Sequence, residues 1–313
     1  MMDDLINQTA LVAFIAAAFR SAVPVAFAAL GAMWSERAGV YNVGLEGSIL
    51  MGAFGAAVGT YWSGSPAVGA VTGLAAGVML GALQALLTVW MRSDQLVSGI
   101  AVNLFCAGLT AFLSRLVFGE KGSTTLPGLV PIPLPALVDV PVLGPSIFRQ
   151  DALAYLLLVV ACISSWLLYR THAGLALRAT GESPRAADSA GVSVRKLRTL
   201  AVVASSALAS LGGAHLVLAQ IHLFAENMSG GRGFLALAIV ILGRWSPGRA
   251  VLAAAFFGVC EAAQLSLQFT HPAVPYQLFL MLPYLASIAA LVGLAGRSRA
   301  PEAVGKPYDR ESR

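Results

Sequence analysis

Long, uncharged apolar runs dominate the chain. They occupy 66–91, 95–114, 152–169, 199–225 and 272–296. A helix needs about 20 apolar residues to cross the hydrocarbon core of a bilayer. The runs are continuously apolar rather than alternating, which excludes a transmembrane β-barrel. We therefore predict an all-α fold, a polytopic transmembrane helical bundle.

The composition supports this prediction. Of the 313 residues, 58% are hydrophobic and 11% are charged, whereas a soluble domain carries about 25% charged residues. The chain therefore has too few charges to cover a soluble surface. Its acidic start, MMDDLINQ, is unlike a cleaved signal peptide, so we expect the first apolar run, 5–33, to be retained as a span.

Basic residues gather in two polar segments, with six between 170 and 198 and five between 297 and 313. The positive-inside rule places both segments on the cytoplasmic side, so an even number of spans must separate them. We predict about nine spans (eight to ten), with the N-terminus outside and the C-terminus cytoplasmic. The predicted spans are 9–33, 44–62, 66–91, 95–117, 152–169, 199–220, 231–243, 250–269 and 275–296.

The run 231–243 is short for a span, and a broken or re-entrant helix is the alternative. We expect one transmembrane domain over 1–313. It would carry an external loop at 119–150, a cytoplasmic loop at 170–198 and a cytoplasmic tail at 297–313. Six prolines in the external loop rule out a long helix there.

Glycines repeat every four residues in the third predicted span, at Gly69, Gly73, Gly77 and Gly81. Such a stripe lies on one helix face and lets a neighbouring backbone approach closely. We therefore assign these residues to helix packing, with a pore-lining role as the alternative.

The cytoplasmic loop contains a short helix with signals at both ends. Ser183 suits the N-cap, Pro184 the first helical position and Gly191 the C-terminal stop, which predicts about two turns. An ordinary amphipathic connector is the alternative. Three alanines are expected to share one side as a smooth contact face: Ala186, Ala187 and Ala190.

A few polar residues fall within or beside the spans, where such groups face the bundle interior or a cavity. Residues 36–47 form an irregular connector, either a hinge near a transport path or a turn in which Arg37 pairs with a carboxylate. The glycine-rich start of 229–249 favours a tight turn at a helix start, which can hold an anion or serve packing alone. Glu261, Gln264 and Gln268 share a helix face, for a pathway or for hydrogen bonds between helices. The candidate pathway residues are Asn42, Glu46, Arg232, Glu261 and Gln264.

Other chemistry has little support. The three cysteines lie in apolar runs and are expected to be free, buried thiols. His215 and His222 lack a third ligand, so we expect no metal site. No G-x-x-x-x-G-K-[ST] phosphate loop occurs, and no nucleophile–base pair supports catalysis. The net charge of +5 reflects membrane orientation and contact with lipid, and does not indicate nucleic-acid binding.

Four segments together resemble a known family. They read ERAGVYNVGLEG, THAGLALRATGESPRAADSAGVSVRKLR, GRGFLALAIVILGRWSP, and LPYLASIAALVG followed by PEAVGKPY. In this order they are similar to bacterial ABC-importer permeases that serve branched-chain amino acids, simple sugars and nucleosides. The sequences of the segments NVGLEGSILMGAF and GRWSP are most similar to those of the nucleoside branch of this family.

The resemblance implies a multi-pass protein of the bacterial cytoplasmic (inner) membrane that is not itself an enzyme. It implies three partners, namely a cytoplasmic ATP-binding subunit, a second, related permease in a heterodimer, and an extracytoplasmic substrate-binding protein. ATP and Mg would be used by the ATPase, with no cofactor on this chain. In such permeases a short cytoplasmic helix inserts into the ATPase. Carried onto this sequence, that coupling segment is Gly181, Glu182, Ser183, Pro184, Arg185, Ala186, Ala187, Asp188, Ser189, Ala190 and Gly191.

The expected substrate is a nucleoside, with simple sugars or branched-chain amino acids as alternatives. An ion-coupled secondary transporter is the rival from another class. It would need intramembrane ionisable relays, for which only Glu46 and Glu261 are candidates. A membrane enzyme would need a convergent catalytic set, and the sequence offers none.

Overall fold

The computed structural model describes residues 2–119, 124–133, 135, 140–270, 274–294 and 299–309. The longer helices are α1 (Met2–Arg37), α2 (Leu45–Ser63), α3 (Pro66–Ala85), α4 (Gln95–Phe118), α6 (Ala152–Arg170), α9 (Val194–His215) and α11 (Pro247–Thr270). The shorter ones are α5 (Leu143–Ile147), α7 (His172–Glu182), α8 (Pro184–Ser189), α10 (Arg232–Leu242), α12 (Tyr276–Leu280) and α13 (Leu282–Leu294). The π-helical turns η1 (Leu86–Trp90) and η2 (Leu216–Ile221) extend α3 and α9.

Six helical segments of the described residues are long and apolar enough to cross a membrane. They are Thr9–Arg37, Pro66–Trp90, Gln95–Phe118, Ala152–Arg170, Val194–Ile221 and Pro247–Thr270. Each contains or closely matches a predicted span, which confirms the prediction of a mostly helical membrane protein. The count of nine spans and the side of each terminus stay predictions.

The three remaining predicted spans form shorter or less apolar helices. The run 231–243 becomes α10, which has 11 residues. The last predicted span is divided into α12 and α13, and 44–62 forms the 19-residue α2. Short or broken helices are tolerated at membrane depth only where other parts of the protein satisfy their ends.

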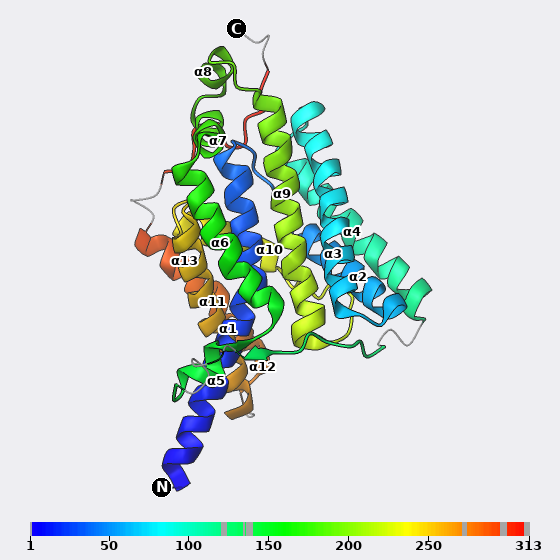
Figure 1. Ribbon diagram of the computed structural model, residues 1–313, viewed down its shortest axis with the longest axis vertical. Helices are drawn as coiled ribbons and strands as arrows, with labels where there is room; N and C mark the ends of the chain where they lie inside the picture. Colours follow the sequence, from blue (N-terminus) through cyan, green and yellow to red (C-terminus); the bar gives the residue numbers. More distant parts are fainter. Residues whose placement is uncertain are drawn as a thin grey trace.

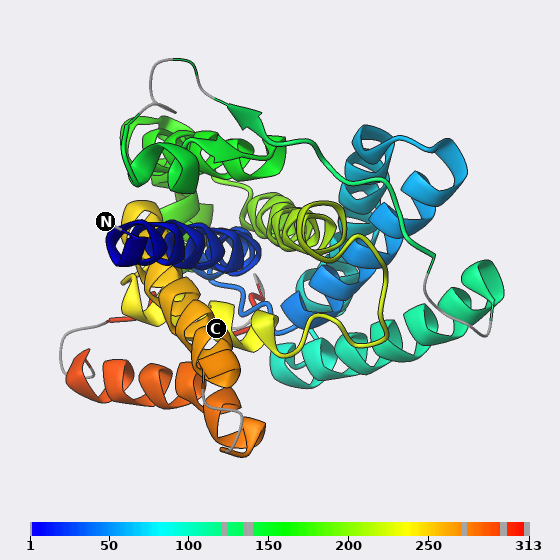
Figure 2. The same ribbon diagram turned by 90° about the horizontal axis from the view of Figure 1, so that it is seen from below.

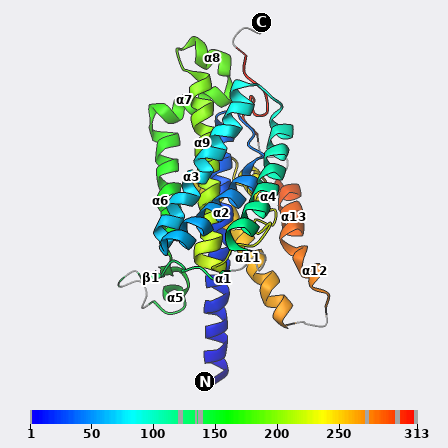
Figure 3. The same cartoon turned by 90° about the vertical axis from the view of Figure 1, so that its right-hand side faces the viewer.

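The centre of the bundle is α9, which packs against α1, α2 and α3, while α3 lies on one side of the molecule (Figure 1). Seen from below, α4 and the α12–α13 pair lie on opposite sides of the molecule, with α10 and α11 between them (Figure 2). The N-terminus lies at one end of the bundle, and α7, α8 and the C-terminal segment lie together at the other end (Figure 3).

The glycine stripe of α3 faces α2 and α9 at very short range. A Cβ added to Gly73 would lie 2.7 Å from the carbonyl oxygen of Gly52 in α2. One added to Gly81 would lie 2.8 Å from the Cα atom of Val203 in α9. Gly69 and Gly77 are equally confined, by Thr60 and Ser210. The stripe therefore sits in helix–helix contacts, where small residues let backbones approach.

Two spans begin at aspartates that cap them. The Asp94 carboxylate accepts from the amides of Leu96 and Val97 at 2.9 Å each, at the start of α4. Asp151 does the same for α6. Both satisfy amides that a helix leaves unpaired at its first turn.

The described part of the loop 119–150 contains no helix longer than the five residues of α5. Two short antiparallel strands, β1 (Ile132–Pro133) and β2 (Arg149–Gln150), pair within it. This agrees with the limit set by the prolines, whereas the external position of the loop stays a prediction.

Candidate substrate pathway and coupling loop

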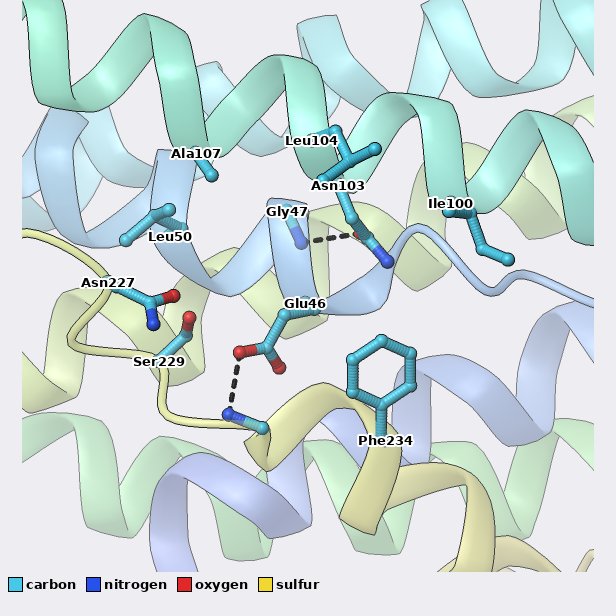
Figure 4. A pocket seen from close by; sticks show the side chains of 11 residues that line it. Glu46, Gly47, Leu50, Ile100, Asn103, Leu104, Ala107, Asn227, Ser229 and Phe234 are labelled. Carbon is cyan, nitrogen blue, oxygen red and sulfur yellow. Dashed lines mark hydrogen bonds between the residues drawn. The ribbon is translucent and has the colours of Figure 1, made fainter.

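Two cavities flank the start of α10. The first, called here the α4 cavity, has a volume of about 310 Å³ and lies between α2, α4 and α10 (Figure 4). Its lining residues are Glu46, Gly47, Leu50, Ile100, Asn103, Leu104, Ala107, Asn227, Ser229, Gly231 and Phe234. The second, called the α11 cavity, has a volume of about 280 Å³ and lies between α1, α10, α11, α12 and α13.

Glu46 joins the first turns of α2 and α10. Its two carboxylate oxygens accept from the backbone amides of Gly231 and Gly233, at 2.7 Å each. A Cβ on Gly233 would lie 2.4 Å from the Glu46 backbone nitrogen, so only glycine permits this approach. The sequence indicated a turn that can hold an anion, and the structure places the Glu46 carboxylate there. A carboxylate at a helix N-terminus is stabilised by the helix dipole.

Three other candidates meet at the α11 cavity. The Arg232 guanidinium forms an ion pair with the Glu261 carboxylate, and Gln264 lies one helical turn further along α11. Arg232 also donates to the carbonyl oxygens of Met228 and Ser229, at 3.3 Å each. The pair thereby fixes the start of α10 against α11. Four of the five candidate pathway residues thus line one of two neighbouring cavities.

Asn42 lies apart from both cavities. Its amide donates to the hydroxyls of Ser205 and Ser206 in α9, at 3.0 and 3.3 Å, and the whole residue is buried. Its side-chain oxygen accepts from the Gly44 amide. In this structure Asn42 fastens the connector before α2 to α9.

The connector also differs from the predicted turn at Arg37. The Arg37 guanidinium donates to the carbonyl oxygen of Trp245 at 3.0 Å. The neighbouring Glu36 carboxylate accepts from the Trp245 indole nitrogen. The two side chains therefore tie the end of α1 to the α10–α11 turn through Trp245. The turn with Arg37 paired to a carboxylate is not what the structure contains.

Sequence reasoning missed four polar or aromatic residues of the α4 cavity, namely Asn103, Asn227, Ser229 and Phe234. Asn103 donates to the Val43 carbonyl at 3.0 Å and accepts from the Gly47 amide at 2.8 Å (Figure 4). As an amide inside an apolar run, it carried the signal that marks polar groups facing a cavity. Ser229 and Phe234 lie in the segment 229–249, whose glycine-rich start had marked a tight turn, whereas nothing in the sequence marked Asn227.

A short helix, α8, lies where the coupling helix is predicted; it is six residues long and begins at Pro184 after Ser183. Its coupling role stays a prediction. Gly191, which follows it, has φ +83°, the left-handed conformation that ends a helix. One prediction for it is wrong: Ala187 is buried against the protein itself, whereas Ala186 and Ala190 are exposed. The three alanines therefore do not form one exposed face.

The segment 299–309, which we call the strap, packs on the loop 170–198. We call this loop the coupling loop after its predicted role. The Ala303 amide donates to the Gly181 carbonyl at 2.9 Å. The Arg198 guanidinium donates to the carbonyls of Ala38 and Lys306, at 3.1 and 3.0 Å. Arg198 thus holds the coupling loop, the α1–α2 connector and the strap together. In the sequence it counted only as an orienting charge.

His215 is a structural partner of Asp151. Its Nε2 lies 3.1 Å from Asp151 Oδ2, with both side chains buried. Burial acts to raise the pKa of Asp151, but the hydrogen bond and charge of His215 and two backbone amides outweigh it and lower the pKa. The described residues contain no group of three potential metal ligands. All three cysteines are free, but only Cys106 is buried; Cys260 is half-buried and Cys162 is exposed.

The family described as branched-chain amino acid transport system / permease component matches residues 14–291. The chain belongs to this family. It is similar to the guanosine ABC transporter permease protein NupQ of Bacillus subtilis, at 35% identity over 92% of this chain and 93% of that protein. It is also similar to the nucleoside permease NupC of Lactococcus lactis, at 34% identity over 91% and 93%.

A putative glucose permease, TsgC13 of Haloferax volcanii, is 35% identical over 94% of this chain and 97% of its own length. No solved structure matches the chain. Family membership and the six span-length helices make this permease component an integral, multi-pass protein of the cytoplasmic (inner) membrane.

Proposed function

We propose that this permease component is the membrane subunit of an ATP-driven ABC importer and forms the translocation pathway for nucleosides. The observation that carries the proposal is the likeness to permeases named for guanosine and nucleosides, which extends over nine-tenths of each chain. A simple sugar is the second candidate, because the relative named for glucose is equally similar.

The pathway would run beside the first turn of α10, between this chain and a second, related permease. Both cavities lie there, and Glu46, Arg232 and Glu261 supply charge next to short helices. Transporter sites commonly form where discontinuous helices begin. The α4 face carries exposed apolar side chains, including Leu104 and Leu116, and it would contact lipid or the partner permease. We favour a heterodimer.

The nine-span topology remains our proposal, with the N-terminus outside and the coupling loop and C-terminal tail cytoplasmic. Its support is that α8 and the strap lie together at the end opposite the N-terminus (Figure 1). Their basic residues then fall on one side, as the positive-inside rule requires. The loop 119–150 would lie outside, within reach of a substrate-binding protein.

Coupling to ATP hydrolysis would use the segment from Gly181 to Gly191, with α8 inserted into a separate ATPase subunit that binds ATP and Mg. The chain itself would hydrolyse nothing. Because Ala186 is exposed on α8, it is the residue to test. Ala186→Glu should leave membrane insertion intact and reduce co-purification of the ATPase subunit by tenfold or so, about 1.4 kcal/mol.

Ala67→Glu serves as the matched control. Ala67 is also exposed, but it lies in the first turn of α3 and not in α8. Normal ATPase association in the Ala186→Glu complex would refute the coupling role. Substrate is tested by reconstituting the complex with its binding protein and measuring uptake of labelled guanosine, glucose and leucine. Uptake of glucose but not guanosine would replace the nucleoside proposal with the sugar one.

A further inference from the structure

The α4 cavity combines apolar walls with one polar corner. Leu50, Ile100, Leu104 and Ala107 line it from α2 and α4, and the Phe234 ring lines it from α10 (Figure 4). Glu46, Asn103, Asn227 and Ser229 supply the polar groups. Its volume of about 310 Å³ is at the small end of ligand sites, which run from about 300 to 1,000 Å³. The lining suits a ligand with apolar faces and a polar edge.

The polar corner has unused hydrogen-bonding capacity. Each Glu46 oxygen accepts one backbone amide, and a carboxylate offers about four lone-pair sites in all. The Ser229 hydroxyl is buried and has no hydrogen-bond partner within the described chain. Burying a hydroxyl without a hydrogen bond costs free energy. A ligand that hydrogen-bonds to the Ser229 hydroxyl would therefore bind more favourably.

The backbone beside this corner is held in an unusual shape. Asn227, Gly230 and Gly231 have φ values of +55°, +56° and +82°. Positive φ is uncommon outside glycine, and residues held in such conformations cluster at ligand sites. This turn brings the Asn227 amide and the Ser229 hydroxyl to the same wall as Glu46 (Figure 4).

The lining of the α4 cavity disfavours two of the three substrate classes of the family. Glu46 is the only charged residue among those that line the α4 cavity, so the carboxylate of an amino acid would find no cation. The hydroxyls that surround a sugar ring would meet apolar walls. A nucleobase has apolar faces and a polar edge, and proteins bind it by stacking on aromatic rings and by hydrogen bonds to that edge.

We propose that the α4 cavity is a purine subsite of the translocation pathway. The Glu46 carboxylate accepts from the ring N–H and exocyclic amine of a guanine-like edge, and the Phe234 ring lies against the base. This inference rests on the proposed nucleoside function. It adds that the permease itself, and not the binding protein alone, recognises the base.

Cysteine labelling in the assembled transporter tests the subsite. The chain has three cysteines, of which Cys162 and Cys260 are accessible and Cys106 is buried. In a Cys162→Ala/Cys260→Ala background, Asn227→Cys places a thiol on the cavity wall. Guanosine should protect this thiol from a charged methanethiosulfonate reagent, whereas glucose and leucine should not.

A second reporter and a control complete the design. Leu104→Cys reports from the α4 side of the same cavity, in case the left-handed backbone at Asn227 does not tolerate cysteine. Ser63→Cys, exposed at the α2–α3 turn, should react without protection. Adding Phe234→Leu should weaken protection by guanosine about fivefold or more, which is the lower end of what loss of a base–aromatic stack costs.

The outcomes separate the two proposals. Guanosine uptake without protection of either reporter would overturn the purine subsite and leave the nucleoside function standing. Protection by glucose would overturn it as well. Absence of guanosine uptake by the intact transporter would refute the nucleoside function itself. If Phe234→Leu does not weaken protection by guanosine, the Phe234 ring does not contact the base.

Discussion

Replacing Gly77 by alanine should weaken the packing of α3 against α9. The added Cβ would lie 2.4 Å from Ser210 Cβ and 2.9 Å from the Ser206 carbonyl oxygen. It would also displace the Ser210 hydroxyl, which donates to the Ser48 carbonyl at 2.7 Å. Overpacking costs about 1–3 kcal/mol, and a lost hydrogen bond about 1 kcal/mol. Alanine returns about 0.5–1 kcal/mol of helix propensity, so the net loss should be about 2 kcal/mol.

The assay is thermal unfolding of the purified protein in detergent, where about 2 kcal/mol corresponds to roughly 3 °C for a chain of this length. The matched control is Gly108→Ala in α4, where an added Cβ would contact nothing within 4 Å; its Tm should stay constant or rise. Ser210→Gly removes the opposing Cβ, so the double variant should lose less stability than the two single variants added together. Equal Tm values for Gly77→Ala and Gly108→Ala would refute this account of the stripe.

Two further predictions concern the ends of the bundle. Ala303→Asp puts a carboxylate at a buried position of the strap; it should raise deuterium uptake around Gly181 in hydrogen-exchange measurements, and unchanged uptake would contradict the contact between them. Because the pKa of Asp151 is lowered in the folded state, its stabilising effect is present above the ordinary aspartate pKa of about 3.9 and is lost as the pH falls through the folded value. Asp151→Asn, which keeps the helix cap but loses the charge opposite His215, should lower Tm by a few degrees at pH 7. It should also flatten the fall of Tm below about pH 5, and a curve parallel to that of the unchanged protein would argue against this role.

The helices were predictable because bilayer thickness and hydropathy act on each segment alone. The run 95–117 became Gln95–Phe118, and 152–169 became Ala152–Arg170. The short α10 was visible as a run too brief for a span. The break between α12 and α13 was missed, although Pro283 in the first turn of α13 is a signal for the start of a new helix.

The site was predictable only in part, because its contacts join distant segments. Glu46 and Arg232 stood out as ionisable groups beside spans. Glu46 contacts the start of α10, and Arg232 contacts Glu261. Both contacts depend on how α2, α10 and α11 pack together. Asn42 has the same polar character as Asn103, yet only Asn103 reaches a cavity. Ala187 similarly resembles Ala186 in sequence, and only the burial of Ala187 in the folded chain tells them apart.

The strap also has a consequence for biogenesis. Ala303 is synthesised more than a hundred residues after Gly181, its hydrogen-bond partner. At about 5–20 residues per second, a ribosome needs several seconds to cover that distance. Until Lys306 is made, the Arg198 guanidinium lacks the Lys306 carbonyl as an acceptor. The loop 170–198 then also lacks its contacts with the strap. The order of translation therefore leaves the loop 170–198 without these contacts until the spans between the loop and the strap have been made.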